Sequence, residues 1–291
     1  MFTTANTKDW LEAHFASINL EALNAKAAML ERLDHKYVVD AGVLFEAIPH
    51  LLEHFDILEI NHRRSFIYET CYFDDEQLSN YFHHHQGRRQ RVKVRTRHYR
   101  DNGSCFLEMK LKDTRGSTVK KRLIYDIDKY GTLDNQALEY LENSHQEHYQ
   151  RPFDRMLSPQ LEMTYRRITL VAHIGNERMT IDSDICFGKG EQAYLVPQQT
   201  FIIETKSNHG RGFADRVLRQ LHQHPTNKCS KYCLGMILTG QVLRANNFKP
   251  TLRKLFLPNT LSNHSLTQLS STTHASRSPS ERLPSFSGAA S

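Results

Sequence analysis

One short segment, RVKVRTR at residues 91–97, most constrains what this chain can fold into. Its residues alternate between basic and uncharged side chains. Side chains two positions apart share one face of a β-strand, so a strand here would be basic on one face and carry valine and threonine on the other. The basic residues are Arg91, Lys93, Arg95 and Arg97. The uncharged face of such a strand must pack against other apolar residues. The basic face needs negative charge nearby to offset the repulsion between its cations.

Later segments repeat this alternation. The residues expected to share a charged face are Glu108 with Lys110, Tyr165 with Arg167, Arg178 with Asp182 and Asp184, Glu204 with Lys206, and Asp34 with Lys36. For any single strand, the simplest interpretation is a solvated charged face on an antiparallel sheet. Over six strands, however, basic side chains on neighbouring strands would repel one another, and an anionic ligand would remove that penalty. We expect the acids Glu108, Asp182 and Asp184 to form ion pairs with these cations.

The spacing of apolar and turn residues predicts many consecutive strands joined by short turns, with helices between some of them. The expected helices are at residues 8–30, 41–54, 74–84, 133–148, 212–222 and 230–238. The expected strands are at residues 31–39, 55–60, 65–73, 90–99, 105–112, 118–127, 160–174, 177–185 and 199–206. The predicted fold class is α+β: an antiparallel β-barrel that forms a basic tunnel, with helices packed outside. We expect an N-terminal helical segment at 1–30, one domain at 31–258, and a disordered Ser-rich tail at 259–291.

The bulk composition is compatible with a globular protein that has an anionic partner. The formal net charge is +6, and the five cysteines include no Cys-x-x-Cys pair, so we expect reduced thiols. The N-terminus does not resemble a signal peptide, and no apolar run reaches the length of a membrane helix. We expect a cytoplasmic protein, for which any association with the inner face of a membrane would require a partner protein.

Nine segments in order resemble the VTC domain of eukaryotic vacuolar polyphosphate polymerases and their bacterial relatives, within the triphosphate tunnel (CYTH-like) superfamily. The segments are HKYVVD, TCYFDDEQLSNYFHH, RVKVRTRHY, FLEMKLK, VKKR, TYRR, RMTIDSDI, FIIETKS and SKYCLGM. They span residues 30–239. No single segment is specific, but their common order is. The sequence departs from the superfamily at its opening Glu-x-Lys motif, where Asp34 stands in place of glutamate.

The resemblance and the strand alternation together assign candidate site residues. The candidate catalytic residues are Arg95, Arg97, Lys110, Arg167, Arg178 and Lys231. The candidate substrate-binding residues are Lys36, Lys93, Lys121, Arg122, Tyr165, Lys206 and Ser230. The resemblance also implies that Glu204 holds Mn²⁺ or Mg²⁺. One choice stays open, because alternation favours Lys120 and Arg122, whereas the family's further basic position could be Lys121.

The resemblance implies a metal-dependent polyphosphate polymerase that transfers the γ-phosphate of a nucleoside triphosphate, with ATP as the expected nucleotide, to a growing polyphosphate chain. Two alternatives remain: a triphosphatase that uses water as the acceptor, and a non-catalytic polyphosphate-binding module. Nucleic acid is not an expected partner, because the basic strands alternate with valine and threonine rather than with aromatic side chains that stack on bases.

Overall fold

The computed structural model describes residues 4–26, 33–114, 117–208 and 210–256. The helices are α1 (Thr4–His14), α2 (Leu20–Lys26), α3 (Ala41–Leu52), α4 (Ser79–Gln86), α5 (Asn135–Tyr149), α6 (Phe213–Gln220), α7 (Lys231–Leu238) and α8 (Lys249–Phe256). The strands are β1 (Ser17–Ile18), β2 (Leu33–Asp40), β3 (Phe55–Leu58), β4 (Ser65–Asp74), β5 (Arg91–Tyr99), β6 (Ser104–Lys112), β7 (Thr118–Tyr125), β8 (Ser158–Ala172), β9 (Arg178–Phe187), β10 (Tyr194–Leu195) and β11 (Thr200–Ser207).

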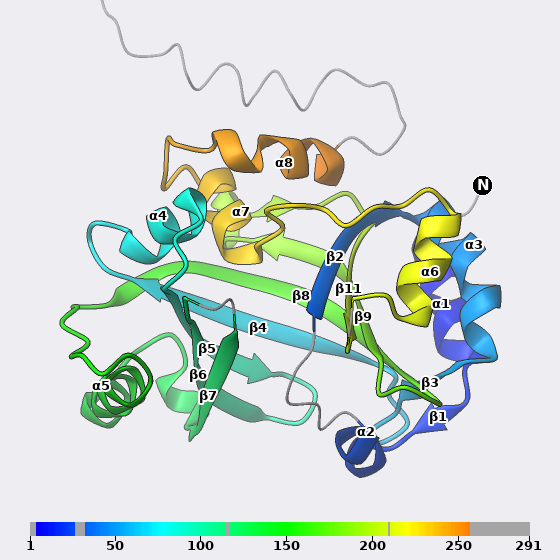
Figure 1. Ribbon diagram of the computed structural model, residues 1–291, viewed down its shortest axis with the longest axis horizontal. Helices are drawn as coiled ribbons and strands as arrows, with labels where there is room; N and C mark the ends of the chain where they lie inside the picture. The colour runs from blue at the N-terminus through cyan, green and yellow to red at the C-terminus, as the bar shows by residue number, and fades with distance from the viewer. Residues whose placement is uncertain (1–3, 27–32, 115–116, 209, 257–291) are drawn as a thin grey trace, which may run out of the picture. The chain divides into compact units, whose positions relative to one another are not determined.

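The strands form one sheet whose main path is antiparallel, in the order β2-β11-β9-β8-β4-β5-β6-β7. The long strands β4 and β8 join the group β5–β7 to the group β9, β11 and β2 (Figure 1). Lys110 on β6 interacts electrostatically with Glu204 on β11 and Lys36 on β2, so the sheet bends until its two ends face each other. Among the described residues, the end strands β2 and β7 are not hydrogen-bonded to each other. The predicted fold class is confirmed, with a barrel that is not closed by hydrogen bonds.

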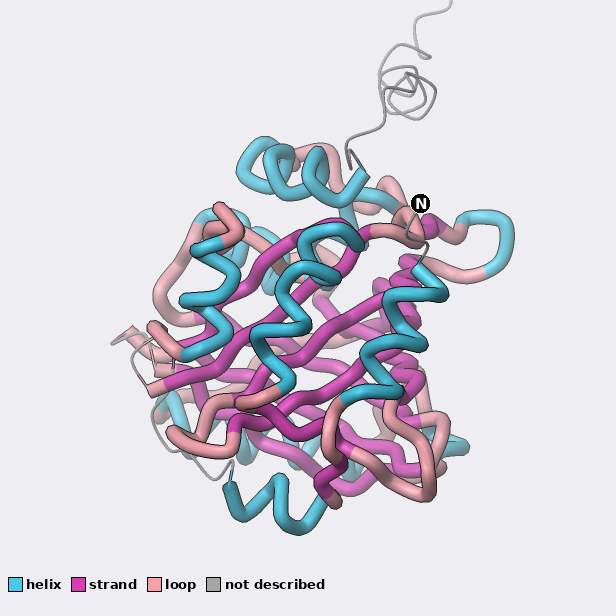
Figure 2. Tube along the Cα trace, turned by 90° about the vertical axis from the view of Figure 1, so that its right-hand side faces the viewer, coloured by secondary structure: helices cyan, strands magenta, loops and turns pink. Residues whose placement is uncertain are grey.

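Helices cover the outer face of the sheet, as the apolar alternate positions require. Helices α1, α3 and α6 pack across β2, β11, β9 and β8 and enclose Met179, Ile181 and Ile203 (Figure 2). Helix α5 covers β5 and β6, where Val94 and Met109 are fully buried. Burying a side chain of this kind contributes about 1.5–3 kcal/mol. The opposite side chains of the same strands, which we call the inner face, are therefore left to the charged residues.

Helices α4, α7 and α8 cover one end of this inner face (Figure 1). Asp74, at the end of β4, is fully buried and accepts hydrogen bonds at 2.9 Å from the backbone amides of Asn80 and Tyr81 in the first turn of α4. It also accepts a bond from the hydroxyl of Tyr232 on α7 at 2.5 Å. Tyr81 in turn donates to the carbonyl of Arg244, between α7 and α8. One buried carboxylate thus fixes α4 against α7 where β5 begins.

The N-terminal region differs from the single helix expected at residues 8–30. Helix α1 ends at His14, the segment Ser17–Ile18 pairs with β3, and α2 begins at Leu20. The break has a local cause, since the side chain of Asn19 accepts a hydrogen bond at 2.8 Å from the amide of Ala22 and so starts a new helix. Residues 27–30 lie outside the described residues.

The described residues, between 4 and 256, form one compact unit. Trp10 of α1 packs against Phe45 of α3, and Arg64 donates to the carbonyls of Glu12 and Phe15 at the end of α1. The Ser-rich tail at 259–291 lies outside the described residues. Among the helices of the described part, none is long and apolar enough to cross a membrane.

Candidate functional site

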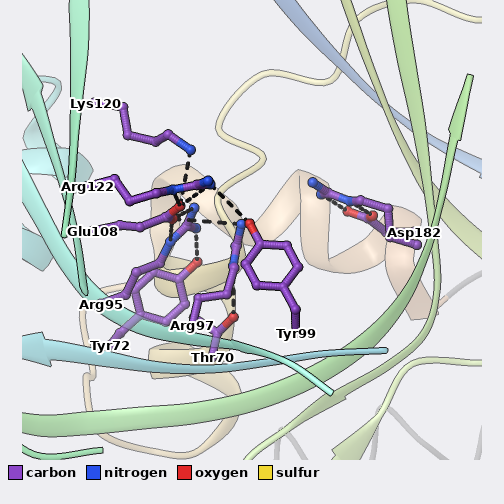
Figure 3. Close-up of polar contacts among 10 residues, drawn as sticks. Thr70, Tyr72, Arg95, Arg97, Tyr99, Glu108, Lys120, Arg122 and Asp182 are labelled. Carbon is purple, nitrogen blue, oxygen red and sulfur yellow. Dashed lines mark hydrogen bonds and ion pairs between the residues drawn. The ribbon is translucent and has the colours of Figure 1, made fainter. Parts of the chain in front are cut away.

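On β5, β6 and β7, one buried carboxylate gathers four cations. Arg95, Glu108 and Arg122 lie directly opposite one another in the strand register. Arg95 donates twice to one oxygen of Glu108, at 2.8 and 2.6 Å, and Arg122 donates twice to the other, at 3.0 and 2.7 Å (Figure 3). Lys120 and Arg97 lie 3.1 and 3.8 Å away. Burial alone would raise the pKa of Glu108, but these cations hold it well below its usual range.

A second buried carboxylate joins β8, β9 and α7. Asp182 is fully buried and accepts a bidentate pair from Arg167, at 2.6 and 2.8 Å (Figure 3). Lys231, the first residue of α7, donates to the same carboxylate. Burial would raise the pKa of Asp182, but Arg167 and Lys231 lower it. The sheet and the helix that covers its end are thereby joined by one charged contact.

A third acidic group lies on β2 and β11. Glu204 accepts from Lys36 at 2.8 Å and from Lys206 at 2.6 Å, and Lys206 also donates to Asp34 at 2.8 Å. Two carboxylates therefore converge on one ammonium group. Burial would raise the pKa of Glu204, but Lys36 and Lys206 hold it well below its usual range. The two lysines consequently hold Glu204 in its ionised form.

Aromatic rings support the cations between these groups. Tyr68 and Tyr165 are stacked, with ring centroids 5.2 Å apart. The guanidinium of Arg167 lies 5.2 Å from both centroids, that of Arg97 lies 5.3 Å from Tyr68, and the ammonium of Lys231 lies 5.0 Å from Tyr165. Cation–π contacts of this kind hold positive groups in place without neutralising them. Arg97 is positioned in this way by Tyr68, whereas Arg167 and Lys231 are also held by Asp182.

Two inner-face lysines form no salt bridge with a carboxylate among the described residues. Lys93 and Lys110 are paired across β5 and β6, and neither forms a salt bridge with any carboxylate in the described ranges. Lys93 donates instead to the hydroxyl of Ser230, the residue that caps α7, at 2.9 Å. Enclosure by the protein lowers the pKa of both ammonium groups to about 8. Lys110 keeps an exposed side chain despite this enclosure, so an anion can reach it.

These lysines predict a pH-dependent anion affinity. Enclosure also lowers the pKa of Lys120 to about 8, so Lys93, Lys110 and Lys120 lose charge as pH rises past that value. Tripolyphosphate does not lose negative charge over the same range. We expect calorimetric titration to show its affinity falling roughly 10-fold or more between about pH 7 and about pH 9.5. An affinity that does not change with pH would contradict the role of these lysines in binding. The anion would then be bound by arginines, which keep their charge over this range.

The structure brings most of the predicted site residues together on the inner face. Those at the contacts described above are Lys36, Lys93, Arg95, Arg97, Lys110, Arg122, Tyr165, Arg167, Glu204, Lys206, Ser230 and Lys231. Arg178, on the same face of β9 as Asp182, pairs in register with Lys206.

The candidate Lys121 is misplaced, because it pairs in register with the buried outer-face residue Met109. Its ammonium contacts Glu147 of α5 at 2.8 Å. Lys120 takes the inner position instead. Lys121 is therefore corrected to a residue of the outer face.

Two further features differ from the simple alternation. Asp184 was expected on the charged inner face, but β9 is irregular between the partners of Thr164 and Arg166, and Asp184 has a φ of 50°. It therefore pairs with Arg166 at the surface. The sequence analysis did not single out Tyr68, or Tyr72, which is buried in the core and whose hydroxyl accepts from Arg95 at 3.2 Å. Alternation through β4 could have identified both tyrosines.

A separate cavity of 470 Å³ lies by the β8–β9 turn and the start of α6. Its lining includes His54, His173, Arg211 and Arg216. It contains none of the candidate residues. Glu177 already fills the start of α6 there, accepting from the amides of Phe213 and Ala214. The charged chemistry lies on the inner face of the sheet instead.

The sequence matches the VTC domain family over residues 31–239, which is more than half of the chain. The chain therefore belongs to the VTC domain family. No curated protein matches the sequence.

Three solved structures illustrate the distant similarity. A candidate adenylate cyclase from Bacillus halodurans is 11% identical with a TM-score of 0.45, and the alignment covers 69% of this chain and 95% of that one. A candidate adenylyl cyclase from Hippeastrum, described as having a dominant triphosphatase activity, is 14% identical with a TM-score of 0.43, at 75% and 100% coverage. The PH1819 protein from Pyrococcus horikoshii is 14% identical with a TM-score of 0.40, at 70% and 96% coverage. The family assignment rests on the VTC match.

Proposed function

We propose that this protein is a polyphosphate polymerase that transfers the γ-phosphate of a nucleoside triphosphate, with ATP as the first candidate, to a growing polyphosphate chain. The observation that carries the proposal is the charge of the inner face. Its cations outnumber the carboxylates that pair with them, and Lys93 and Lys110 form no salt bridge with a carboxylate among the described residues. A densely charged anion such as a phosphate chain would supply the missing negative charge.

We assign each residue a role in phosphoryl transfer from its position on the inner face. Arg95, Arg97 and Arg167 present guanidinium groups held by carboxylates or rings, suited to the equatorial oxygens of a phosphoryl group. A terminal phosphate oxygen of the growing chain attacks the γ-phosphorus in line. The bond from the γ-phosphorus to the bridging oxygen breaks, and the nucleoside diphosphate leaves with the electron pair. This chemistry depends on positioning and charge stabilisation, and no covalent enzyme intermediate is needed.

Glu204 is our proposed ligand for Mn²⁺ or Mg²⁺. It and Asp34 already converge on the single ammonium of Lys206, so a cation could take that position if Lys206 turned toward a phosphate. No group of three or more acidic, histidine or cysteine side chains in the described ranges is placed to hold a metal. The residues fit an ion that keeps water and substrate phosphates as its other ligands, as Mg²⁺ commonly does. Such an ion would neutralise charge that develops on the phosphates.

Ser230 and Lys231 favour chain synthesis over hydrolysis. They connect the start of α7 to Lys93 and Asp182 and so place a helix at one end of the inner face. They also match the VTC pattern in particular. A phosphate acceptor held there would exclude the water that hydrolysis requires.

The test is an incubation of the protein with γ-labelled ATP and Mn²⁺, followed by gel and thin-layer separation of products. We expect a ladder of phosphate chains together with ADP, and the loss of both in Arg95→Ala and in Glu204→Ala. Labelled inorganic phosphate without chains would replace the polymerase with a triphosphatase. Absence of turnover, with polyphosphate binding that needs Arg95 and not Glu204, would identify a binding module.

A further inference from the structure

The cavity of 470 Å³ beside α6 lies on the opposite side of the sheet from the inner face. Its walls come from the residues after α3, the β8–β9 turn and the segment that leads from β11 into α6, in the part of the molecule where α3 and α6 lie side by side (Figure 1). Ser207 of β11 lines the cavity, whereas its neighbour Lys206 contacts Glu204 on the inner face. A ligand of this cavity would therefore be separated by the sheet from a phosphate chain.

Ser207 gives the first indication of a ligand. Its side chain is 5% exposed, and its hydroxyl meets no hydrogen-bond partner in the described structure. A buried hydroxyl without a partner costs roughly 1–3 kcal/mol. Asn208, the next residue along the chain, is exposed and lines the same wall. A polar ligand in the cavity would supply the hydrogen bond that the protein does not.

Two arginines make the rim of the cavity positive. The guanidinium of Arg216 lies 5.4 Å from the ring centroid of Phe213 and donates to the carbonyl of Arg211 at 3.1 Å. Both arginine side chains are exposed, and neither forms a salt bridge with a carboxylate in the described ranges. Glu177 occupies the first amides of α6, so an anion would have to bind to the arginines instead. Guanidinium groups match the oxygens of a phosphate.

The cavity also has an aromatic wall and enough room for an organic ligand. The rings of His54 and Phe213 line it, with their centroids 3.9 Å apart, and Ala172 and Ile174 add apolar surface. The carbonyl of His54 accepts from the amide of His173 at 2.9 Å, which fixes this wall to the end of β8. The volume is typical of small-molecule sites and exceeds what an inorganic phosphate would fill. Nucleic-acid bases stack on aromatic side chains of this kind.

We propose that this cavity is a second ligand site and that its ligand is a mononucleotide. Arg211 and Arg216 hold the phosphate, and Ser207 forms a hydrogen bond with the ribose. The base lies against His54 and Phe213. The site does not depend on the reaction at the inner face, so it would serve a polymerase and a triphosphatase alike.

The experiment is a calorimetric titration of the full chain with AMP and with UMP, as purine and pyrimidine probes. We expect at least one of them to bind in one copy per chain, and ribose 5-phosphate to bind roughly tenfold more weakly because it lacks the base. Lys110→Met, which changes only the inner face, should bind the nucleotide as the wild type does. Absence of binding by both nucleotides, equal affinity for ribose 5-phosphate, or a loss of binding in Lys110→Met would each overturn the proposal.

Two variants of the cavity complete the test. Arg216→Met should weaken nucleotide binding about tenfold or more, and Ser207→Ala about fivefold. The melting temperature of Ser207→Ala should stay equal or rise, since its hydroxyl has no partner in the described structure. Arg219→Met is the matched control, because Arg219 is also exposed on α6 but lies outside the cavity lining. Wild-type affinity in Arg216→Met, or a Ser207→Ala protein that loses stability and keeps its affinity, would refute the site.

Discussion

Glu108→Gln is expected to lower the free energy of unfolding by about 3–5 kcal/mol, and the melting temperature by roughly 10 °C. Glu108 is 1% exposed, and Arg95, Arg122 and Lys120 all donate to it. Removing its charge leaves these cations close together without compensation, while the amide can accept only part of their hydrogen bonds. Urea denaturation and thermal melting of the two proteins would measure the loss.

The same variant should respond unusually strongly to ligand. Tripolyphosphate brings negative charge to the cations that Glu108 had neutralised, so it should raise the melting temperature of Glu108→Gln more than that of the wild type. Glu147→Gln is the matched control, since Glu147 is exposed and pairs with Lys121 on the outer face, so its loss should cost less than about 1 kcal/mol. A Glu108→Gln protein as stable as that control would mean that the cations do not depend on Glu108.

Much of the fold and of the site followed from alternation along the strands. Arg95, Glu108 and Arg122 were each expected on a charged face, and the register places them side by side. Alternation succeeds here because these strands are regular and their other face is covered by apolar helices. The expected ion pairs of Glu108 and Asp182 are present for the same reason.

The predictions that were wrong have physical causes that cannot be read from the residue pattern of one strand. Asp184 leaves the inner face because an irregularity in β9 turns it outward. Lys121 was a candidate on the basis of a motif, although alternation predicted Lys120 and Arg122 on the charged face. The structure agrees with alternation, because Lys121 contacts Glu147 on the outer face. Helix α8 was not expected, and its burial of Leu255 depends on distant elements. Contacts of this kind are made by tertiary packing and cannot be read from local spacing.

The inner-face charges divide into two kinds with opposite effects on stability. Arg95, Arg167 and Lys36, which are held by Glu108, Asp182 and Glu204, have raised pKa values and support the fold. Lys93 and Lys110 lack such partners, and their lowered pKa values mean that the folded protein binds these protons less tightly than the unfolded chain does. Their charge is thus a cost to the folded state below about pH 8, and that cost disappears as pH rises toward the unfolded pKa of 10.5. Function and stability therefore make opposite demands on these two lysines.

The substitution Lys110→Met should distinguish the effect of this lysine on function from its effect on stability. We expect polymer synthesis and tripolyphosphate affinity to fall about 100-fold, because a cation that faces the bound phosphates is lost. The melting temperature at about pH 7 should stay equal or rise, because the cost of enclosing the ammonium charge, which exceeds the attraction of Glu204, is gone. Lys254→Met, at an exposed position of α8, makes the same chemical change away from the inner face and should leave activity unchanged. A Lys110→Met protein that loses activity and stability together would show instead that Lys110 supports the fold.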